Sequence, residues 1–194
     1  MMDEQQLKWQ VTGERALLHT PVFDVIEQHE VSATDIAGDY VAVAAPDWAM
    51  VAAVYRGCFV MVRQWRHAAR MLTTEFPGGV VDGGENPADA AARELYEETG
   101  FKAGRMTLLG SVSPNPALFK NRFHVYLAEE LVPTGEQKLD DDELLAYQLI
   151  PVDEVICSYG RDGYTHALMG TAIALFLQHD RLKQAEENEH ENDR

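Results

Sequence analysis

One segment limits the possible folds of this chain more than any other: a glycine-rich loop that leads into a strongly signalled amphipathic helix. The loop contains Gly78-Gly79 and Gly83-Gly84, and Asn86 and Pro87 are favoured residues for the N-cap and first turn of a helix. Gly100 is a typical helix stop. Small or apolar residues recur between these ends at helical spacing and predict a stripe that packs on a sheet: Ala88, Ala91, Ala92, Leu95 and Thr99.

The segments around this helix are mostly extended. Apolar runs rich in β-branched residues predict strands over residues 22–31, 40–45, 48–55, 58–64, 73–76, 106–112, 122–128 and 144–150. Near the N-terminus, two short strands are expected on either side of a turn at Thr12-Gly13-Glu14, and Arg56-Gly57 predicts a tight hairpin. Further helices are expected at residues 152–157 and about 165–184. The pattern predicts the α/β class, with a mixed sheet flanked by helices and an N-terminal antiparallel β extension.

Charge and composition narrow the classes of function. The chain has 194 residues, 46% of them hydrophobic, and a formal net charge of -16. One domain with appendages fits this length, and the negative charge opposes binding to long nucleic acid. The polar, acidic N-terminus does not resemble a signal peptide, and no apolar run approaches the roughly 18 residues of a membrane helix. We therefore expect a cytoplasmic protein without membrane contact, in which Cys58 and Cys157 are free thiols.

The expected helix carries a cluster of carboxylates. At about 100° per residue, Glu94, Glu97 and Glu98 fall within one narrow arc, and Glu85 lies just before the N-cap. Like charges at this spacing repel each other by a few tenths of a kcal/mol per pair, and a hard cation such as Mg²⁺ or Mn²⁺ would remove the conflict. For these three glutamates alone, a solvated acidic helix face is the alternative interpretation.

The spacing around the cluster decides between the two. Gly79 is followed by five residues, Glu85, seven residues, and then Arg93-Glu94-Leu95-Tyr96-Glu97-Glu98-Thr99-Gly100-Phe101. This pattern resembles the Nudix box with every defining position filled. The resemblance implies a Nudix α/β/α sandwich around a mixed β-sheet, and an enzyme that cleaves a diphosphate linkage with Mg²⁺, for which Mn²⁺ is a possible substitute.

The resemblance also implies roles for single residues. The implied metal-binding positions supply oxygen atoms and are Gly79, through its backbone carbonyl, Glu85, Glu94, Glu97 and Glu98. Arg93 would orient and partly neutralise these carboxylates, and Glu97 and Glu98 would also belong to the catalytic set.

Segments outside the box resemble the ADP-ribose pyrophosphatase and nucleotide-sugar hydrolase branch of the family. These are Arg63-Gln64-Trp65-Arg66 and Glu75-Phe76-Pro77-Gly78-Gly79. The branch implies that Arg63 and Arg66 contact substrate, that Arg66 reaches a phosphate or the terminal sugar, and that Glu75 bonds the sugar or organises the site. The alternatives are a surface ion pair for Arg66 and a solubilising edge-strand charge for Glu75.

The general base in this branch sits on an acidic loop. The candidates here are Asp140, Asp141, Asp142 and Glu143, and Glu143 is favoured. The implied reaction is hydrolysis of ADP-ribose or a nucleoside-diphosphate-sugar to a nucleoside monophosphate and a sugar phosphate. Alternatives are a dinucleoside polyphosphate or nucleoside triphosphate pyrophosphohydrolase, or a ligand sensor without catalysis.

Three regions are expected along the chain. Residues 1–39 form the N-terminal β extension, which the resemblance implies is a dimerisation segment of a homodimer; residues 40–183 form the Nudix hydrolase domain; and residues 184–194 form a polar, flexible tail. The histidines, His166 included, show no metal-ligand spacing and are interpreted as structural or exposed.

Overall fold

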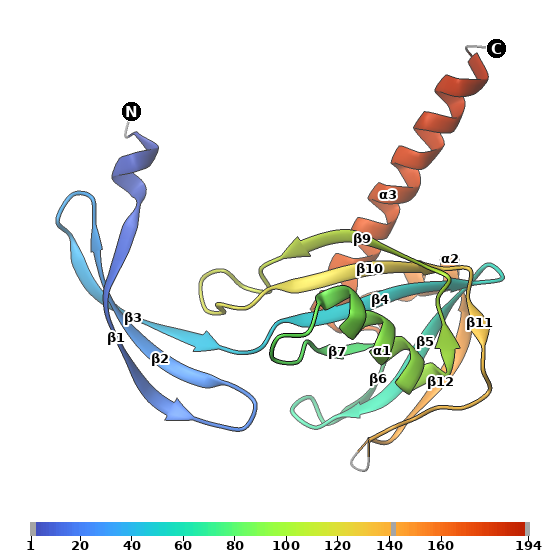
Figure 1. Ribbon diagram of the computed structural model, residues 1–194, viewed down its shortest axis with the longest axis horizontal. Coiled ribbons are helices and arrows are strands. Elements are labelled where there is room, and N and C mark those ends of the chain that lie inside the picture. The colour runs from blue at the N-terminus through green and yellow to red at the C-terminus, as the bar shows by residue number, and fades with distance from the viewer. Residues whose placement is uncertain (1–2, 141–142, 193–194) are drawn as a thin grey trace. The chain divides into compact units, whose positions relative to one another are not determined.

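The computed structural model describes residues 3–140 and 143–192 and divides into two compact units (Figure 1). The first contains residues 1–46 and 113–122, and the second contains residues 47–112 and 123–194.

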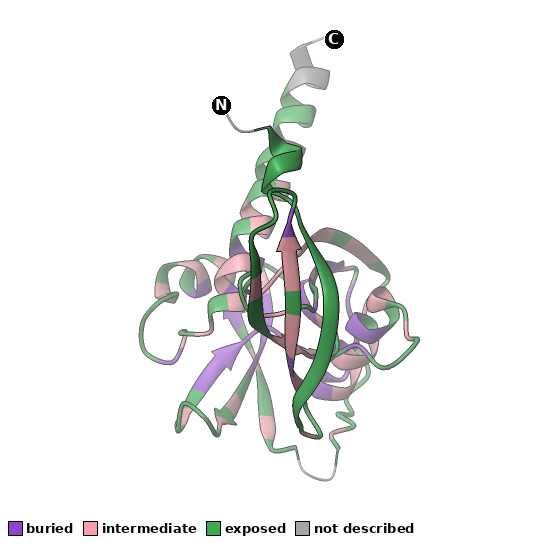
Figure 2. Cartoon of the chain, turned by 90° about the vertical axis from the view of Figure 1, so that its left-hand side faces the viewer, coloured by how far each residue is buried: buried purple, intermediate pink, exposed green. Residues whose placement is uncertain are grey.

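The first unit contains a three-stranded antiparallel sheet. A short 3₁₀ turn, η1 (Glu4–Leu7), precedes β1 (Trp9–His19), β2 (Asp24–Ser32) and β3 (Ala37–Ala44), which pair in that order. The predicted turn at residues 12–14 is wrong, because β1 continues through it with a register shift between Val11 and Gly13. A glycine inside a strand often marks such a bulge. Every residue of β1 is exposed (Figure 2).

The second unit contains a mixed seven-stranded sheet. Its strands are β4 (Trp48–Tyr55), β5 (Cys58–Arg66), β6 (Met71–Glu75), β7 (Gly78–Val80), β9 (Arg105–Val112), β10 (Phe123–Glu129) and β12 (Leu145–Pro151). The main order is β12-β5-β4-β10-β9, with β6 on β5 and β7 on β4; only the β4–β10 pair of this sheet is parallel among the described residues. The predicted hairpin at Arg56-Gly57 is confirmed, with both residues at positive φ.

Helices cover both faces of this sheet. They are α1 (Pro87–Thr99), α2 (Val152–Ser158) and α3 (Ala167–Asn192). Alternate residues of β4 point to opposite sides, so that Val51 packs in one core with Leu95 of α1, and Ala52 packs in a second core with Val155 of α2 and Met169 of α3. The predicted α/β/α sandwich is confirmed.

The predicted ends of α1 are confirmed, and its buried face is displaced around the helix from the predicted stripe. The side chain of Asn86 accepts a hydrogen bond from the backbone N–H of Ala88 at 2.9 Å, and Gly100 ends the helix at φ 70°. Ala92 is exposed and Ala90 is buried, against the predicted stripe. The helix therefore turns part of its carboxylate-bearing side inward.

Two further points concern the C-terminal half. The last helix runs to Asn192, beyond the predicted end near residue 184, through a segment of good helix formers. Within the described part of the chain, no helix is long and apolar enough to cross a membrane.

Candidate active site

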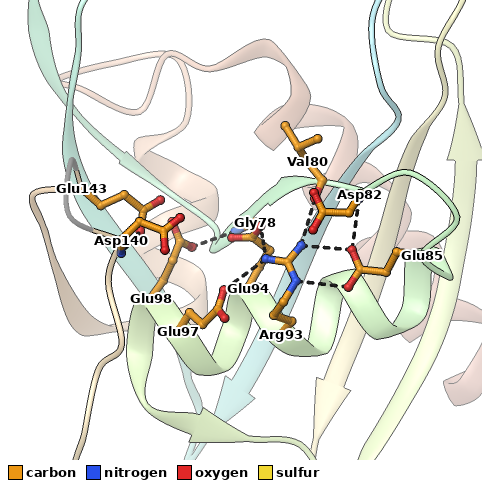
Figure 3. Close-up of polar contacts among 10 residues, drawn as sticks. All are labelled: Gly78, Val80, Asp82, Glu85, Arg93, Glu94, Glu97, Glu98, Asp140 and Glu143. Carbon is orange, nitrogen blue, oxygen red and sulfur yellow. Dashed lines mark hydrogen bonds and ion pairs between the residues drawn. The ribbon is translucent and has the colours of Figure 1, made fainter. Parts of the chain in front are cut away.

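Arg93 gathers three carboxylates on one side of α1 (Figure 3). Its Nη1 donates to Glu94 Oε1 at 2.9 Å and to Glu97 Oε2 at 3.1 Å. Its Nε and Nη2 donate to the two oxygens of Glu85, both at 3.1 Å, and Nη2 also donates to the carbonyl of Val80 at 3.1 Å. The bond from Arg93 holds the pKa of the Glu85 carboxyl below its usual range. The structure therefore brings together Glu85, Arg93, Glu94 and Glu97, as the box spacing predicts.

Glu94 lies directly against the loop before α1. A Cβ atom on Gly79 would stand 2.5 Å from Glu94 Oε1 and 2.7 Å from its Cδ. The absence of a side chain at Gly79 therefore lets β7 approach the helix. Burial raises the pKa of Glu94 above its usual value, although its contact with Arg93 opposes the shift.

Glu98 is the most deeply buried carboxylate of the cluster. It is 3% exposed, and its Oε2 accepts a hydrogen bond from the backbone N–H of Gly78 at 2.9 Å. Burial raises the pKa of Glu98 to about 8, and the charges of Glu94 and Glu143 act in the same direction. A buried acid of this kind is stabilised as an anion when a cation stands beside it.

The donor set suits a hard divalent cation. Carboxylate and carbonyl oxygens are the ligands that Mg²⁺ and Mn²⁺ prefer. Over residues 3–140 and 143–192, no three acidic, histidine or cysteine side chains converge around a single point as they stand. Arg93 spans Glu94 and Glu97 in this arrangement, so ion binding would require these carboxylates to exchange contacts with its guanidinium.

A loop crosses the C-terminal end of α1 and carries Asp140 and Glu143 toward the cluster. The backbone N–H of Thr134 donates to the carbonyl of Gly100 and that of Lys138 to the carbonyl of Glu97, both at 2.8 Å. The bonds from Thr134 and Lys138 hold the loop over the last turn of α1. Further along, the backbone N–H of Glu143 donates to the carbonyl of Asp140 at 3.0 Å, and the backbone N–H of Asp140 donates to Glu143 Oε2 at 3.2 Å.

Among the four candidates for the general base, the loop brings Glu143 close to the cluster (Figure 3). Its charge contributes to the raised pKa of both Glu94 and Glu98. Asp141 and Asp142 lie outside the described residues.

An ion pair between partly exposed Arg66 and buried Glu75 lies on the adjoining strands. Arg66 Nε donates to Glu75 Oε1 at 2.9 Å, Arg66 Nη2 donates to Oε2 at 2.6 Å, and Thr73 Oγ1 donates to Oε1 at 2.6 Å. Burial opposes ionisation of Glu75, but the bonds from Arg66, the proximity of His166 and the bond from Thr73 outweigh burial and hold the pKa of Glu75 far below its usual range. At 1% exposure Glu75 is not a solubilising edge charge, whereas Arg66 does form an ion pair, with its side chain 43% exposed.

These residues open onto a cavity of about 460 Å³. Its polar lining consists of Arg66, Thr73, Glu75, Thr165 and His166, and its wall also includes Gly78 and Gly79, which touch Glu98 and Glu94. Sequence reasoning missed His166, whose Nδ1 lies 3.1 Å from Glu75 Oε2. Arg63 does not line the cavity and instead donates to Thr74 Oγ1 at 3.2 Å.

Comparison with known proteins identifies relatives of this chain. The chain is 33% identical over 109 residues to the ADP-ribose pyrophosphatase of Bacillus subtilis (strain 168), which is 56% of this chain and 59% of that protein. It is 30% identical over 94 residues to the ADP compounds hydrolase NudE of Escherichia coli (strain K12), 48% of this chain and 49% of that protein. The chain thus spans about half to three fifths of the length of these curated relatives.

The fold and the family model extend the likeness. A solved structure described as an ADP compounds hydrolase matches 94% of this chain and 98% of its own, with a TM-score of 0.79 and 22% identity, and so shares the fold. The NUDIX domain model matches residues 46–169, more than half of the chain and all of α1. On that match, the chain belongs to the NUDIX domain family.

Proposed function

We propose that this protein is a metal-dependent NUDIX pyrophosphohydrolase that acts on ADP-ribose or a nucleoside-diphosphate-sugar. The products would be a nucleoside monophosphate and a sugar phosphate. The observation that carries the proposal is the pair of carboxylates Glu94 and Glu98 against Gly79 and Gly78, which line a cavity large enough for a small ligand. Similarity to proteins described as an ADP-ribose pyrophosphatase and as an ADP compounds hydrolase supports this substrate class.

The proposed metal ligands are the oxygen donors of the box. Glu94 and Glu98 would hold Mg²⁺, or Mn²⁺ in its place, with Glu97, Glu85 and the carbonyl of Gly79 as further donors. A bound ion would neutralise the diphosphate oxygens and acidify a water molecule. Arg93 already orients Glu85, Glu94 and Glu97. When the carboxylates of Glu94 and Glu97 turn to the ion, Arg93 would remain beside them and partly neutralise their charge.

Proton transfer is assigned to Glu143. A water molecule that attacks a phosphorus atom must lose a proton, and a carboxylate within hydrogen-bond reach accepts it. The loop anchored on α1 brings Glu143 close enough to Glu98 for their charges to interact. Of the acidic run, Glu143 is therefore the proposed general base.

Arg66 is the proposed contact for the substrate on the cavity side. Glu75 holds its guanidinium through two oxygens, which fixes a fork of N–H donors at the cavity wall. Arg63, which donates to Thr74 and lies outside the cavity lining, remains a proposed substrate contact on the family resemblance alone.

We also propose that the chain forms a homodimer through its N-terminal β segment, residues 1–39. Several large apolar side chains of this segment are exposed, namely Trp9, Val11, Leu17, Leu18 and Val22. Exposed apolar clusters of this kind mark protein interfaces. Light scattering coupled to size exclusion would give twice the chain mass, and a monomer at all concentrations would contradict the proposal. A cytoplasmic location belongs to the same proposal, and cell fractionation tests it.

One assay tests the activity. The purified protein is incubated with Mg²⁺ and ADP-ribose, UDP- and GDP-sugars, diadenosine polyphosphates or nucleoside triphosphates, and release of nucleoside monophosphate is measured with and without a chelator. We expect chelator-sensitive AMP or UMP release from the diphosphate-sugars. Faster turnover of a nucleoside triphosphate or a dinucleoside polyphosphate would show that this compound class, and not the diphosphate-sugars, is the substrate. Metal binding without any turnover would favour a ligand sensor.

A further inference from the structure

Glu75 has little capacity left for a ligand. A carboxylate offers about four acceptor positions. Oε1 accepts from Arg66 and Thr73, and Oε2 accepts from Arg66 and lies 3.1 Å from His166 Nδ1. The side chain is also 1% exposed. Glu75 is therefore a positioning residue, which acts on a bound molecule through the residues that it holds.

One of those residues is His166, which lies immediately before α3. Its Nδ1 is buried and close to Glu75 Oε2, but without the alignment of a hydrogen bond, and it has no other partner in the described part of the chain. The side chain as a whole is 35% exposed, and His166 lines the cavity. A buried polar atom without a hydrogen bond requires an explanation. One explanation is that the imidazole turns into hydrogen-bond alignment with Glu75 when a ligand binds its other nitrogen.

The chemistry of the two held groups defines the ligand. Oε2 of ionised Glu75 can only accept, so in the neutral form of the imidazole the proton lies on the facing Nδ1 and Nε2 is an acceptor. Arg66 keeps N–H groups that Glu75 does not use, and these can only donate. A donor beside an acceptor suits a hydroxyl group, which both donates and accepts, whereas an ionised phosphate oxygen only accepts.

We propose that His166, held by Glu75 next to Arg66, binds a hydroxyl of the sugar on the distal side of the diphosphate and so selects sugar-bearing substrates. This inference rests on the proposed function. The same cavity is lined by Gly78 and Gly79, which touch Glu98 and Glu94. A diphosphate at the carboxylate cluster would therefore have one of its two substituents next to this cavity.

Two substitutions separate the two ring nitrogens. His166→Asn keeps an amide near Glu75 but removes the group at the position of Nε2, whereas His166→Gln extends an amide oxygen toward that position. His179→Asn is the matched control, because His179 lies on α3, about 18 Å along the helix from its first residue. Thermal unfolding of each full-length variant reports whether the fold is kept.

Product binding tests the proposal without turnover. Ribose 5-phosphate and AMP are titrated calorimetrically into each protein with Mg²⁺ present. We expect His166→Asn to weaken ribose 5-phosphate binding roughly 10-fold, with His166→Gln in between and AMP unchanged. Equal loss for both ligands, or loss for AMP alone, would overturn the proposal, since the cavity would then hold a different part of the substrate.

Turnover gives the second readout. ADP-ribose is compared with the β-methyl ester of ADP, which has the same diphosphate but no distal sugar. His166→Asn should raise KM for ADP-ribose and lower its kcat/KM roughly 10-fold, while values for the methyl ester stay within 2-fold. If the wild type hydrolyses ADP-ribose and the ratio of kcat/KM for the two substrates is the same in His166→Asn as in the wild type, the role of His166 is overturned and the proposed function stands.

Failure of the proposed function gives a different result. If neither compound is hydrolysed, the binding experiment still decides about His166. If His166→Asn does not fold, wild-type protein is titrated with ribose 5-phosphate and with methyl phosphate. Binding of the sugar phosphate no tighter than that of methyl phosphate overturns the proposal, and tighter binding by roughly 10-fold supports it.

Discussion

The carboxylate of Glu94 occupies the space in which a side chain on Gly79 would stand. A Cβ atom there would come within 2.5 Å of Oε1, closer than such contacts occur in proteins. Gly79 pairs with Ala49 of the central strand, so neither the strand nor the helix can easily yield. The glycine thus sets how closely the loop approaches the proposed metal ligand.

Replacement of Gly79 by alanine should therefore displace the carboxylate of Glu94. We expect kcat/KM to fall about 10–100-fold, because contacts that orient metal ligands have effects of this size. Gly83→Ala in the same loop is the control, since a Cβ there meets nothing within 4 Å. Equal activity of the two variants in a diphosphate hydrolysis assay would remove the role assigned to the Gly79–Glu94 contact.

Substitution of Glu98 by glutamine should abolish turnover and stabilise the metal-free fold. Since folding raises the pKa of Glu98 from 4.5 to about 8, ionisation destabilises the fold as pH rises through that window. At pH 8, with a chelator, we expect Tm of the variant to exceed that of wild type by about 3 °C or more, and the difference to vanish near pH 5. Thermal scans and turnover measure both effects.

Added Mg²⁺ provides the control for this variant. A ligand that binds the native state raises Tm, so wild type should gain stability and Glu98→Gln should gain much less. An active, folded Glu98→Gln protein would remove the assignment of Glu98 as a metal ligand.

The elements with strong local signals were predictable from sequence. Asn86 and Gly100 mark the ends of α1, and the apolar run from Trp48 to Tyr55 is β4 as predicted. Strands β7, β8 (Phe101–Lys102) and β11 (Val132–Pro133) have two or three residues and carry no periodicity. Their pairing is set by the tertiary fold. The expected turn inside β1 is wrong for the same reason, because pairing with β2 keeps the segment around Gly13 extended.

The candidate site divides in the same way. Helical spacing alone places Glu94, Glu97 and Glu98 on one face, and the structure shows Arg93 bound to the first two. His166 reaches Glu75 from the start of α3, far away in the sequence. No local spacing connects those two positions, so only the folded chain reveals the contact.

The acidic loop yields a comparison between two carboxylates. Glu143→Gln should slow turnover far more than Asp140→Asn, because Glu143 interacts with the charges of Glu94 and Glu98. A general base contributes roughly 10²–10⁴-fold, so kcat is the quantity to measure at saturating substrate and Mg²⁺. If Glu143→Gln slows turnover no more than Asp140→Asn, Glu143 is not the base.

The Arg66–Glu75 pair should make stability depend on pH in the acid range. Because folding lowers the pKa of Glu75 below 4.5, its contribution is fully present above that pH and is lost as pH falls further. We expect Glu75→Gln to lower the free energy of unfolding by about 2–3 kcal/mol at pH 7, at the low end for a broken buried pair because Arg66 is partly exposed.

Urea unfolding at pH 7 and at pH 3 measures this contribution. Wild type should lose more stability than Glu75→Gln between the two pH values, since the variant no longer has a carboxyl to protonate. Glu186→Gln is the matched control, because Glu186 is exposed on α3 and should leave the pH dependence unchanged. The same loss of stability in Glu75→Gln and wild type would show that the ion pair does not hold these two strands together.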